Sequence, residues 1–142
     1  YQVFDERRYF VAGNQPCVFD VAGTKVGLLI CEDAWFDRPA QKARDLGAQV
    51  LLVLNASPFH VGKGYEREVT MCQRAQATGL PLVYAHLVGG QDEVVFEGHS
   101  FALDADGSVA GRAPSFKENM FFAQVEHAQA AIKFVAIRMK SP

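Results

Sequence analysis

Short apolar runs alternate with amphipathic stretches along the chain. Cys17–Val21 and Lys25–Ile30 flank the turn-forming residues Ala22-Gly23-Thr24, a pattern typical of a β-hairpin. Val50–Leu54 and Leu80–Ala85 are apolar at nearly every position, as expected of strands covered on both faces. The pattern therefore predicts a hairpin followed by two buried strands.

Two stretches between these runs have helical spacing and helical end signals. Asp37–Leu46 carries Pro39 in its first turn and is followed by Gly47, which ends the helix. Tyr65–Thr78 places apolar residues three and four apart and is followed by Gly79. Each helix connects one predicted strand to the next, so the connections are crossovers.

The last predicted strands are Ser100–Leu103 and Val109–Gly111, on either side of the turn Asp104-Ala105-Asp106-Gly107. Strands that alternate with helices indicate an α/β fold, and hairpins together with crossovers favour a mixed sheet. The character of the chain changes after residue 126. Residues 127–142 start Ala-rich and end basic, and we expect a helix or a loosely held arm there.

Composition excludes several function classes. The 142 residues suit one domain, with 49% hydrophobic and 21% charged residues, as in ordinary globular proteins. The net charge is -2 and no cluster of Lys and Arg stands out, so we expect no binding to nucleic acid or to a membrane. No apolar run approaches the roughly 20 residues needed to cross a bilayer. The first residue is Tyr and no signal peptide is visible, so we expect a fragment of a longer protein.

The three cysteines are Cys17, Cys31 and Cys72. An odd number without a pairing pattern argues against a disulfide framework and fits a reducing cytoplasm. No group of Cys and His has zinc spacing, so we expect no metal site. We expect Cys17, at the start of a strand, and Cys72, on the apolar face of a helix, to be shielded from solvent.

Three polar segments follow predicted strand ends, where open sheets commonly bind ligands: Cys31–Trp35, Asn55–His60 and His86–Glu93. A thiol at the end of a buried strand suits a nucleophile, and the backbone N–H of Glu32 could stabilise an oxyanion. The alternative is that Cys31 is an ordinary core residue. Asn55 and Ser57 could likewise cap turns, and the Gly-Gly pair in the third segment could be a turn in a solvated loop.

Together, these segments resemble the nitrilase (carbon–nitrogen hydrolase) superfamily, and within it the glutaminase domains of glutamine-dependent NAD synthetases. The resemblance covers residues 1–126, and its motifs occur in the family's order and spacing. The matching stretches are Tyr1–Phe10 (YQVFDERRYF), Gly27–Trp35 (GLLICEDAW), Leu54–Glu68 (LNASPFHVGKGYERE), Val88–Phe96 (VGGQDEVVF) and Ser100–Gly107 (SFALDADG).

The resemblance implies a nitrilase-type α-β-β-α sandwich with a mixed sheet, incomplete at its N-terminus. Residues 1–126 would be the C-terminal part of the glutaminase domain, and 127–142 a tail. In this family a Glu-Lys-Cys triad hydrolyses an amide, with Cys as nucleophile, Glu as base and Lys stabilising the oxyanion. The nucleophile falls on Cys31, with the Glu32 N–H as one oxyanion donor.

The family positions of the triad Glu and Lys fall before the first residue of this sequence. Lys25 and Lys63 belong to other motifs and do not match the triad Lys. Glu6 matches a further carboxylate that orients the triad in some nitrilases. The resemblance also places four residues near the glutamine: Tyr1, Trp35, Ser57 and Lys63.

Three positions depart from the family pattern. Asn-Gln commonly precedes the Val-Gly-Gly segment, and this chain has His86-Leu87 there. His99 stands at a Gly-rich position. These changes could alter the polarity of the pocket or its coupling to a second domain.

The resemblance implies that the parent protein hydrolyses glutamine through a Cys thioester, without a cofactor. Ammonia would pass to a synthetase domain of the same parent chain, which uses ATP and Mg²⁺ to amidate nicotinate adenine dinucleotide. No Ser-Gly-Gly loop of such a domain occurs in this sequence. We further expect a cytoplasmic homo-oligomer.

Two other functions remain open. One is a stand-alone amidase of the same superfamily that acts on another small amide. The other is a non-catalytic fragment or interaction module, since the triad Glu and Lys are not in this sequence.

Overall fold

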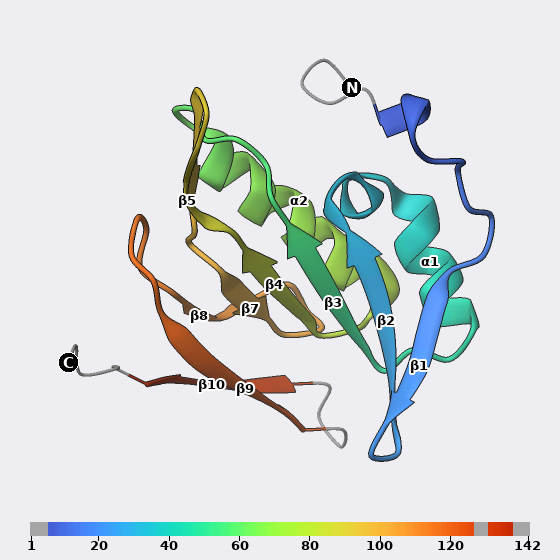
Figure 1. The fold of residues 1–142 in the computed structure, drawn as a ribbon. Coiled ribbons are helices and arrows are strands. Elements are labelled where there is room, and N and C mark those ends of the chain that lie inside the picture. Colours follow the sequence, from blue (N-terminus) through green and yellow to red (C-terminus); the bar gives the residue numbers. More distant parts are fainter. Residues whose placement is uncertain (1–5, 127–130, 138–142) are drawn as a thin grey trace.

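The computed structural model describes residues 6–126 and 131–137. Strands and helices alternate as far as residue 86, and the described residues after that form three hairpins (Figure 1). The elements are η1 (Glu6–Arg8), β1 (Cys17–Val21), β2 (Thr24–Ile30), η2 (Cys31–Trp35), α1 (Asp37–Asp45), β3 (Val50–Asn55), α2 (Lys63–Thr78), β4 (Leu82–His86), β5 (Val88–Gln91), β6 (Val94–Glu97), β7 (Phe101–Leu103), β8 (Val109–Arg112), β9 (Met120–Glu126) and β10 (Ala131–Ile137); η marks a 3₁₀ helix.

The main sheet has six strands in the order β1-β2-β3-β4-β7-β8. Strands β2, β3 and β4 are parallel, and the remaining neighbours are antiparallel, which confirms the predicted mixed sheet. Ile30 lies opposite Leu54, and Asn55 lies opposite His86. The three parallel strands therefore end at the same edge of the sheet, so the segments that follow them start side by side.

Helices α1 and α2 cover one face of this sheet (Figure 1). The core between them is apolar and includes Leu29, Leu51, Val53, Met71 and Leu82. Gly27 lets α1 approach β2 closely, because a Cβ at this position would lie 3.0 Å from the Cβ of Ala43.

The other face of the sheet carries the alternate side chains of the same strands. Ile30 is 59% exposed and Leu54 is 50% exposed, although both belong to central strands. Phe19 on the edge strand β1 is also exposed on this face, opposite Val26. Within the described residues, helices cover one face of the sheet. The other face exposes apolar side chains at Ile30, Leu54 and Phe19, whereas Val26 and Val50 on the same face are buried.

Most predicted elements are confirmed: the first hairpin, both helices, both buried strands and the second hairpin. Two features differ from the sequence-based interpretation. The Gly89-Gly90 pair lies within strand β5, which pairs with β6, and the turn is formed by Asp92 and Glu93 instead. Part of the tail is strand β10, which pairs with β9; residues 127–130 and 138–142 lie outside the described residues.

No helix in the described ranges has the length and hydrophobicity to cross a membrane.

Candidate active site

Cys31 stands at the junction between β2 and η2. Its φ is 46°, a left-handed conformation that non-glycine residues adopt at a cost of order 1–3 kcal/mol. The turn is held from both sides: the Asp33 carboxylate accepts a hydrogen bond from the Ile30 N–H at 3.0 Å, and Ala34 is fully buried. A nucleophile on a sharp strand-to-helix turn of this kind is a known arrangement in hydrolases. The N–H of Glu32 lies in the first turn of η2, where backbone donors lack partners within the helix.

Two polar residues, Asn55 and His86, lie beside Cys31 at the ends of the neighbouring parallel strands. The strand register puts Asn55 next to the start of η2 and His86 next to Asn55. Asn55 is 7% exposed and His86 is 8% exposed. Within the described part of the chain, the Asn55 amide has no hydrogen-bond partner, and the ring nitrogens of His86 make no hydrogen bond of good geometry. The hydroxyl of Tyr84, two residues before His86 in β4, is also buried without a hydrogen-bond partner in the described part of the chain. Buried polar groups are normally satisfied, so this cluster beside the thiol is suited to a polar ligand or to water.

His86 is neutral in the folded protein. Burial, with the positive charge of Arg67 as a smaller cause, lowers the pKa of His86 to about 4. The ring meets Tyr84 edge to face, with 6.1 Å between centroids. A neutral imidazole at this position can donate one hydrogen bond and accept another.

The buried His86 should make the protein less stable in mild acid. An unfolded imidazole takes up a proton below about pH 6.5, whereas folded His86 does so only near pH 4. The unfolded state therefore binds more protons across this window, and stability falls as the pH falls through it. In urea unfolding at pH 7, 6 and 5, His86→Asn should show a smaller decline in midpoint than the wild type. His60→Asn is the control, because His60 is exposed; equal declines in all three proteins would contradict the assignment.

Two of the residues expected near the substrate contact each other. The Lys63 Nζ lies 4.3 Å from the centroid of the Trp35 ring, a cation–π contact between α2 and η2. Lys63 also donates to Glu66 at 2.9 Å, and this hydrogen bond lowers the pKa of the Glu66 carboxyl. Ser57 is half-buried in the loop between β3 and α2. The loop after β2 and the loop after β3 thus face the same edge of the sheet.

The remaining predicted residues are less informative. Tyr1 lies outside the described residues, and Glu6 is the first residue of η1. The expectation that Cys17 is shielded is wrong: Cys17 is exposed, because β1 is the edge strand and has a neighbour on one side only. Cys72 is half-buried, and burial raises the pKa of its thiol.

Sequence analysis missed two buried arginines on α2, Arg67 and Arg74. Arg67 forms an ion pair with Glu97 of β6, and Arg74 forms one with Asp37 at the start of α1. The signal was present in the sequence, because the two residues are seven apart and so share one helix face with Met71 and Ala75.

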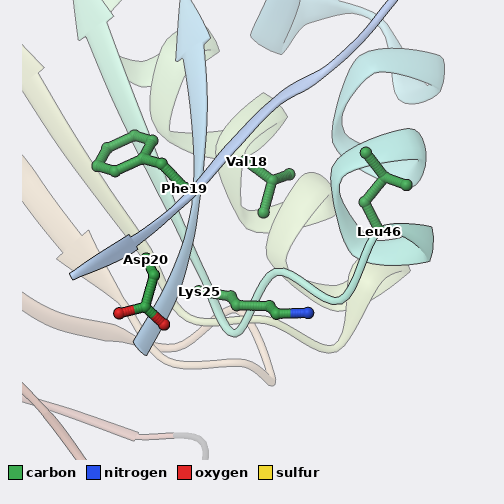
Figure 2. A pocket seen from close by; sticks show the side chains of 5 residues that line it. All are labelled: Val18, Phe19, Asp20, Lys25 and Leu46. Atoms are coloured by element: carbon green, nitrogen blue, oxygen red, sulfur yellow. The ribbon is translucent and has the colours of Figure 1, made fainter. Parts of the chain in front are cut away.

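A shallow hollow of about 210 Å³ lies elsewhere, between the β1–β2 hairpin and the end of α1 (Figure 2). It is lined by Val18, Phe19, Asp20, Lys25 and Leu46. It lies near the start of β2, whereas Cys31 follows the end of that strand, so the hollow is separate from the thiol. In the parts of the chain that the structure describes, no three His, Cys, Asp or Glu side chains gather as they do around a metal ion.

Comparison with known proteins agrees on one family. The family model described as carbon-nitrogen hydrolase matches residues 2–132. A glutamine-dependent NAD(+) synthetase of Acinetobacter baylyi is 44% identical over 133 residues, which are 94% of this chain and 25% of the relative. The corresponding protein of Aquifex aeolicus is 38% identical over 134 residues, which are 94% of this chain and 24% of the relative. The chain spans about a quarter of the length of these relatives.

Solved structures give the same result. The glutamine-dependent NAD+ synthetase of Acinetobacter baumannii in complex with ADP superimposes with a TM-score of 0.87 at 40% identity, covering 99% of this chain and 26% of that one. An amidase of Nesterenkonia sp. AN1 superimposes with a TM-score of 0.69 at 29% identity, covering 77% of this chain and 41% of that one. The latter structure shows the acetamide moiety of fluoroacetamide covalently added at the active site cysteine of the amidase. The chain therefore belongs to the carbon–nitrogen hydrolase family and has its nitrilase-type α/β fold.

Proposed function

We propose that this chain is the part of a glutaminase domain that carries the nucleophile, in a glutamine-dependent NAD synthetase. The observation that carries the proposal is Cys31, held in a left-handed turn at the shared end of the parallel strands. The similarity of nearly the whole chain to glutamine-dependent NAD synthetases supports the choice of glutamine over another amide.

In the proposed reaction, the Cys31 thiolate attacks the carbon of the glutamine side-chain amide. The carbonyl oxygen becomes an oxyanion, to which the Glu32 N–H donates. The C–N bond breaks, the nitrogen takes up a proton and leaves as ammonia, and a glutamyl thioester remains on Cys31. Water then attacks the thioester, which releases glutamate and restores the thiol.

Binding of the substrate is assigned to the residues around this edge. Ser57 and Lys63 lie on the loop after β3 and at the start of α2, where a hydroxyl and a cation can contact the α-amino and carboxylate groups of glutamine. Trp35 is assigned as a wall of the glutamine pocket, and the cation–π contact that places Lys63 over its ring supports grouping these two residues. Tyr1 as a second wall and Glu6 as an orienting carboxylate rest on the family motif alone.

The released ammonia is proposed to pass to a synthetase domain of the same protein, where ATP and Mg²⁺ support amidation of nicotinate adenine dinucleotide. The length of the relatives, about four times that of this chain, leaves room for such a domain. Three reduced cysteines fit a cytoplasmic location. A homo-oligomer is also proposed.

The test of the function uses the full-length gene product that carries this sequence. Ammonia release is measured with glutamine and with butyramide, and NAD formation is measured with glutamine or ammonium as the nitrogen source. Turnover of glutamine that supports NAD formation is the expected result. Ammonia release from butyramide alone would favour the stand-alone amidase instead.

Ser57→Ala should weaken binding of glutamine more than it slows the chemistry. Loss of one hydrogen bond worth about 1.4 kcal/mol would raise KM roughly tenfold. Because this contact is made equally in the ground state and the transition state, kcat should change little. Steady-state kinetics with glutamine measures both constants. A loss confined to kcat would show that Ser57 takes part in the chemistry or in folding.

A further inference from the structure

Two arginines of helix α2 lie near the sheet edge at which the parallel strands end, next to Cys31. Arg67 is 1% exposed and Arg74 is 9% exposed. Seven residues are close to two helical turns, so both side chains leave the same face of the helix, about 10.5 Å apart along its axis. Buried arginines need several acceptors, and each of these two finds them in a different loop.

Arg74 binds the segment that follows Cys31. Its Nε donates to the carbonyl oxygen of Ala34 at 3.1 Å, and its Nη2 donates to the carbonyl oxygen of Trp35 at 3.3 Å. Its Nη1 pairs with the carboxylate of Asp37. Ala34 and Trp35 end η2, where carbonyl groups lack partners within the helix. One guanidinium thus fixes the end of the turn that Cys31 begins.

Arg67 binds the segment that contains Ser57. Its Nη2 donates to the carbonyl oxygens of Ser57 at 3.2 Å and Pro58 at 3.4 Å. Its Nη1 pairs with the buried carboxylate of Glu97. Gly64 leaves room for this pair, because a Cβ there would lie 3.3 Å from the Glu97 Oε1. The second guanidinium thus fixes the loop after β3 and ties it to β6.

We propose that Arg67 and Arg74 are positioning residues for the reaction: Arg74 holds the Cys31 turn, Arg67 holds the Ser57 loop, and α2 sets the distance between them. The proposal rests on the proposed function for the roles of Cys31 and Ser57. Neither arginine is assigned a contact with substrate. A misplacement of about 1 Å can cost 100-fold in rate, so the spacing matters to the chemistry.

The two arginines should therefore affect different kinetic constants. Loosening the Cys31 turn displaces the nucleophile and lowers kcat. Loosening the Ser57 loop disturbs a binding contact and raises KM. A role in folding alone would lower the amount of active enzyme for both variants alike and would leave KM unchanged.

The experiment uses Arg67→Lys and Arg74→Lys in the full-length gene product. Lysine keeps the charge, but it lacks the planar, forked guanidinium that donates to two carbonyl oxygens and a carboxylate at once. Arg112→Lys is the matched control, because Arg112 makes a two-pronged, exposed pair with Glu68 on the same helix, at 2.6 and 2.8 Å. All kinetics are measured well below the melting temperature of each variant, with ammonia-driven synthesis as the measure of intact protein.

We expect Arg74→Lys to lower kcat for glutamine about tenfold or more with KM within twofold. Arg67→Lys should raise KM about tenfold with kcat within threefold, and Arg112→Lys should change neither. If Arg74→Lys does not fold, Asp37→Asn loosens the same clamp at an exposed residue and should lower kcat severalfold. Parallel changes in both constants for the two arginine variants, or a shift in melting temperature alone, would overturn the proposal.

A second readout separates this proposal from the proposed function. The rate at which chloroacetamide alkylates Cys31 is compared with the rate for exposed Cys17 in the same molecules, by peptide mapping. Arg74→Lys should change the Cys31-to-Cys17 ratio at least threefold, and Arg67→Lys and Arg112→Lys should not. This result would support the Arg74 clamp even if glutamine proved not to be the substrate, and an unchanged ratio would refute the clamp even if glutamine were turned over.

Discussion

Cys31→Ala should abolish glutamine-driven NAD synthesis in the full-length gene product and leave ammonia-driven synthesis intact. Without the sulfur no thioester forms, and the expected loss of glutaminase activity is roughly 10³-fold or more, as for removal of other catalytic nucleophiles. Ammonium supplied from solution bypasses this step. Both rates are measured in one preparation, so a folding defect would lower both and be recognised.

Labelling tests the same assignment. Diazo-oxo-norleucine, an electrophilic analogue of glutamine, should modify Cys31 and be blocked by glutamine. Cys17 is exposed, so a general alkylating agent should reach it, and the specificity for Cys31 must come from the glutamine part of the reagent. Cys72→Ala is the matched control and should keep glutamine-driven synthesis. A label on Cys72, or activity that survives Cys31→Ala, would refute Cys31 as the nucleophile.

The 142-residue polypeptide alone should release no measurable ammonia from glutamine. This expectation rests on the family motif, which places the triad Glu and Lys outside this sequence. Without a base and a nearby cation, a thiol is mostly protonated at neutral pH. Loss of one oxyanion donor costs roughly 10²–10³ in rate, and the losses do not simply add because triad members act as a unit.

An ammonia-release assay on the purified polypeptide, with Cys31→Ala as blank, measures this directly. Lys63 is the candidate in this chain to replace the triad Lys. However, its Nζ already contacts the Glu66 carboxylate and the Trp35 ring. Turnover that disappears in Cys31→Ala would show that an acid and a base within this chain, such as Glu6 and Lys63, complete the site.

Apolar patterning predicted the elements of the main sheet well, because burial on one face or both dictates residue type in a strand. It was less successful with glycine. A turn was one of two interpretations left open for Gly89 and Gly90, yet these residues pair with Phe96 and Val95 inside a hairpin. The predicted helix starts at Tyr65, yet α2 begins at Lys63, and Gly64 in its first turn leaves room for the Glu97 carboxylate.

The residues of the candidate site also differ in how well the sequence predicts them. Cys31 could be identified because it follows an apolar run and its motif is specific. The burial of Asn55 and His86 could not, since a polar residue after a strand is equally typical of a turn. The acceptors of Arg67 and Arg74 lie 10 and 40 residues away in the sequence, at Ser57 and Ala34, and spacing along one helix says nothing about them.

The exposed apolar side chains on the sheet face opposite the helices affect how quaternary structure can be measured. Exposed Ile30 and Leu54 lie on neighbouring strands, and apolar surface of this kind favours self-association. The mass of the isolated polypeptide in solution should then depend on its concentration. A multimer of this polypeptide observed by light scattering or sedimentation would reflect self-association through these exposed side chains. The native number of subunits therefore has to be determined on the full-length gene product.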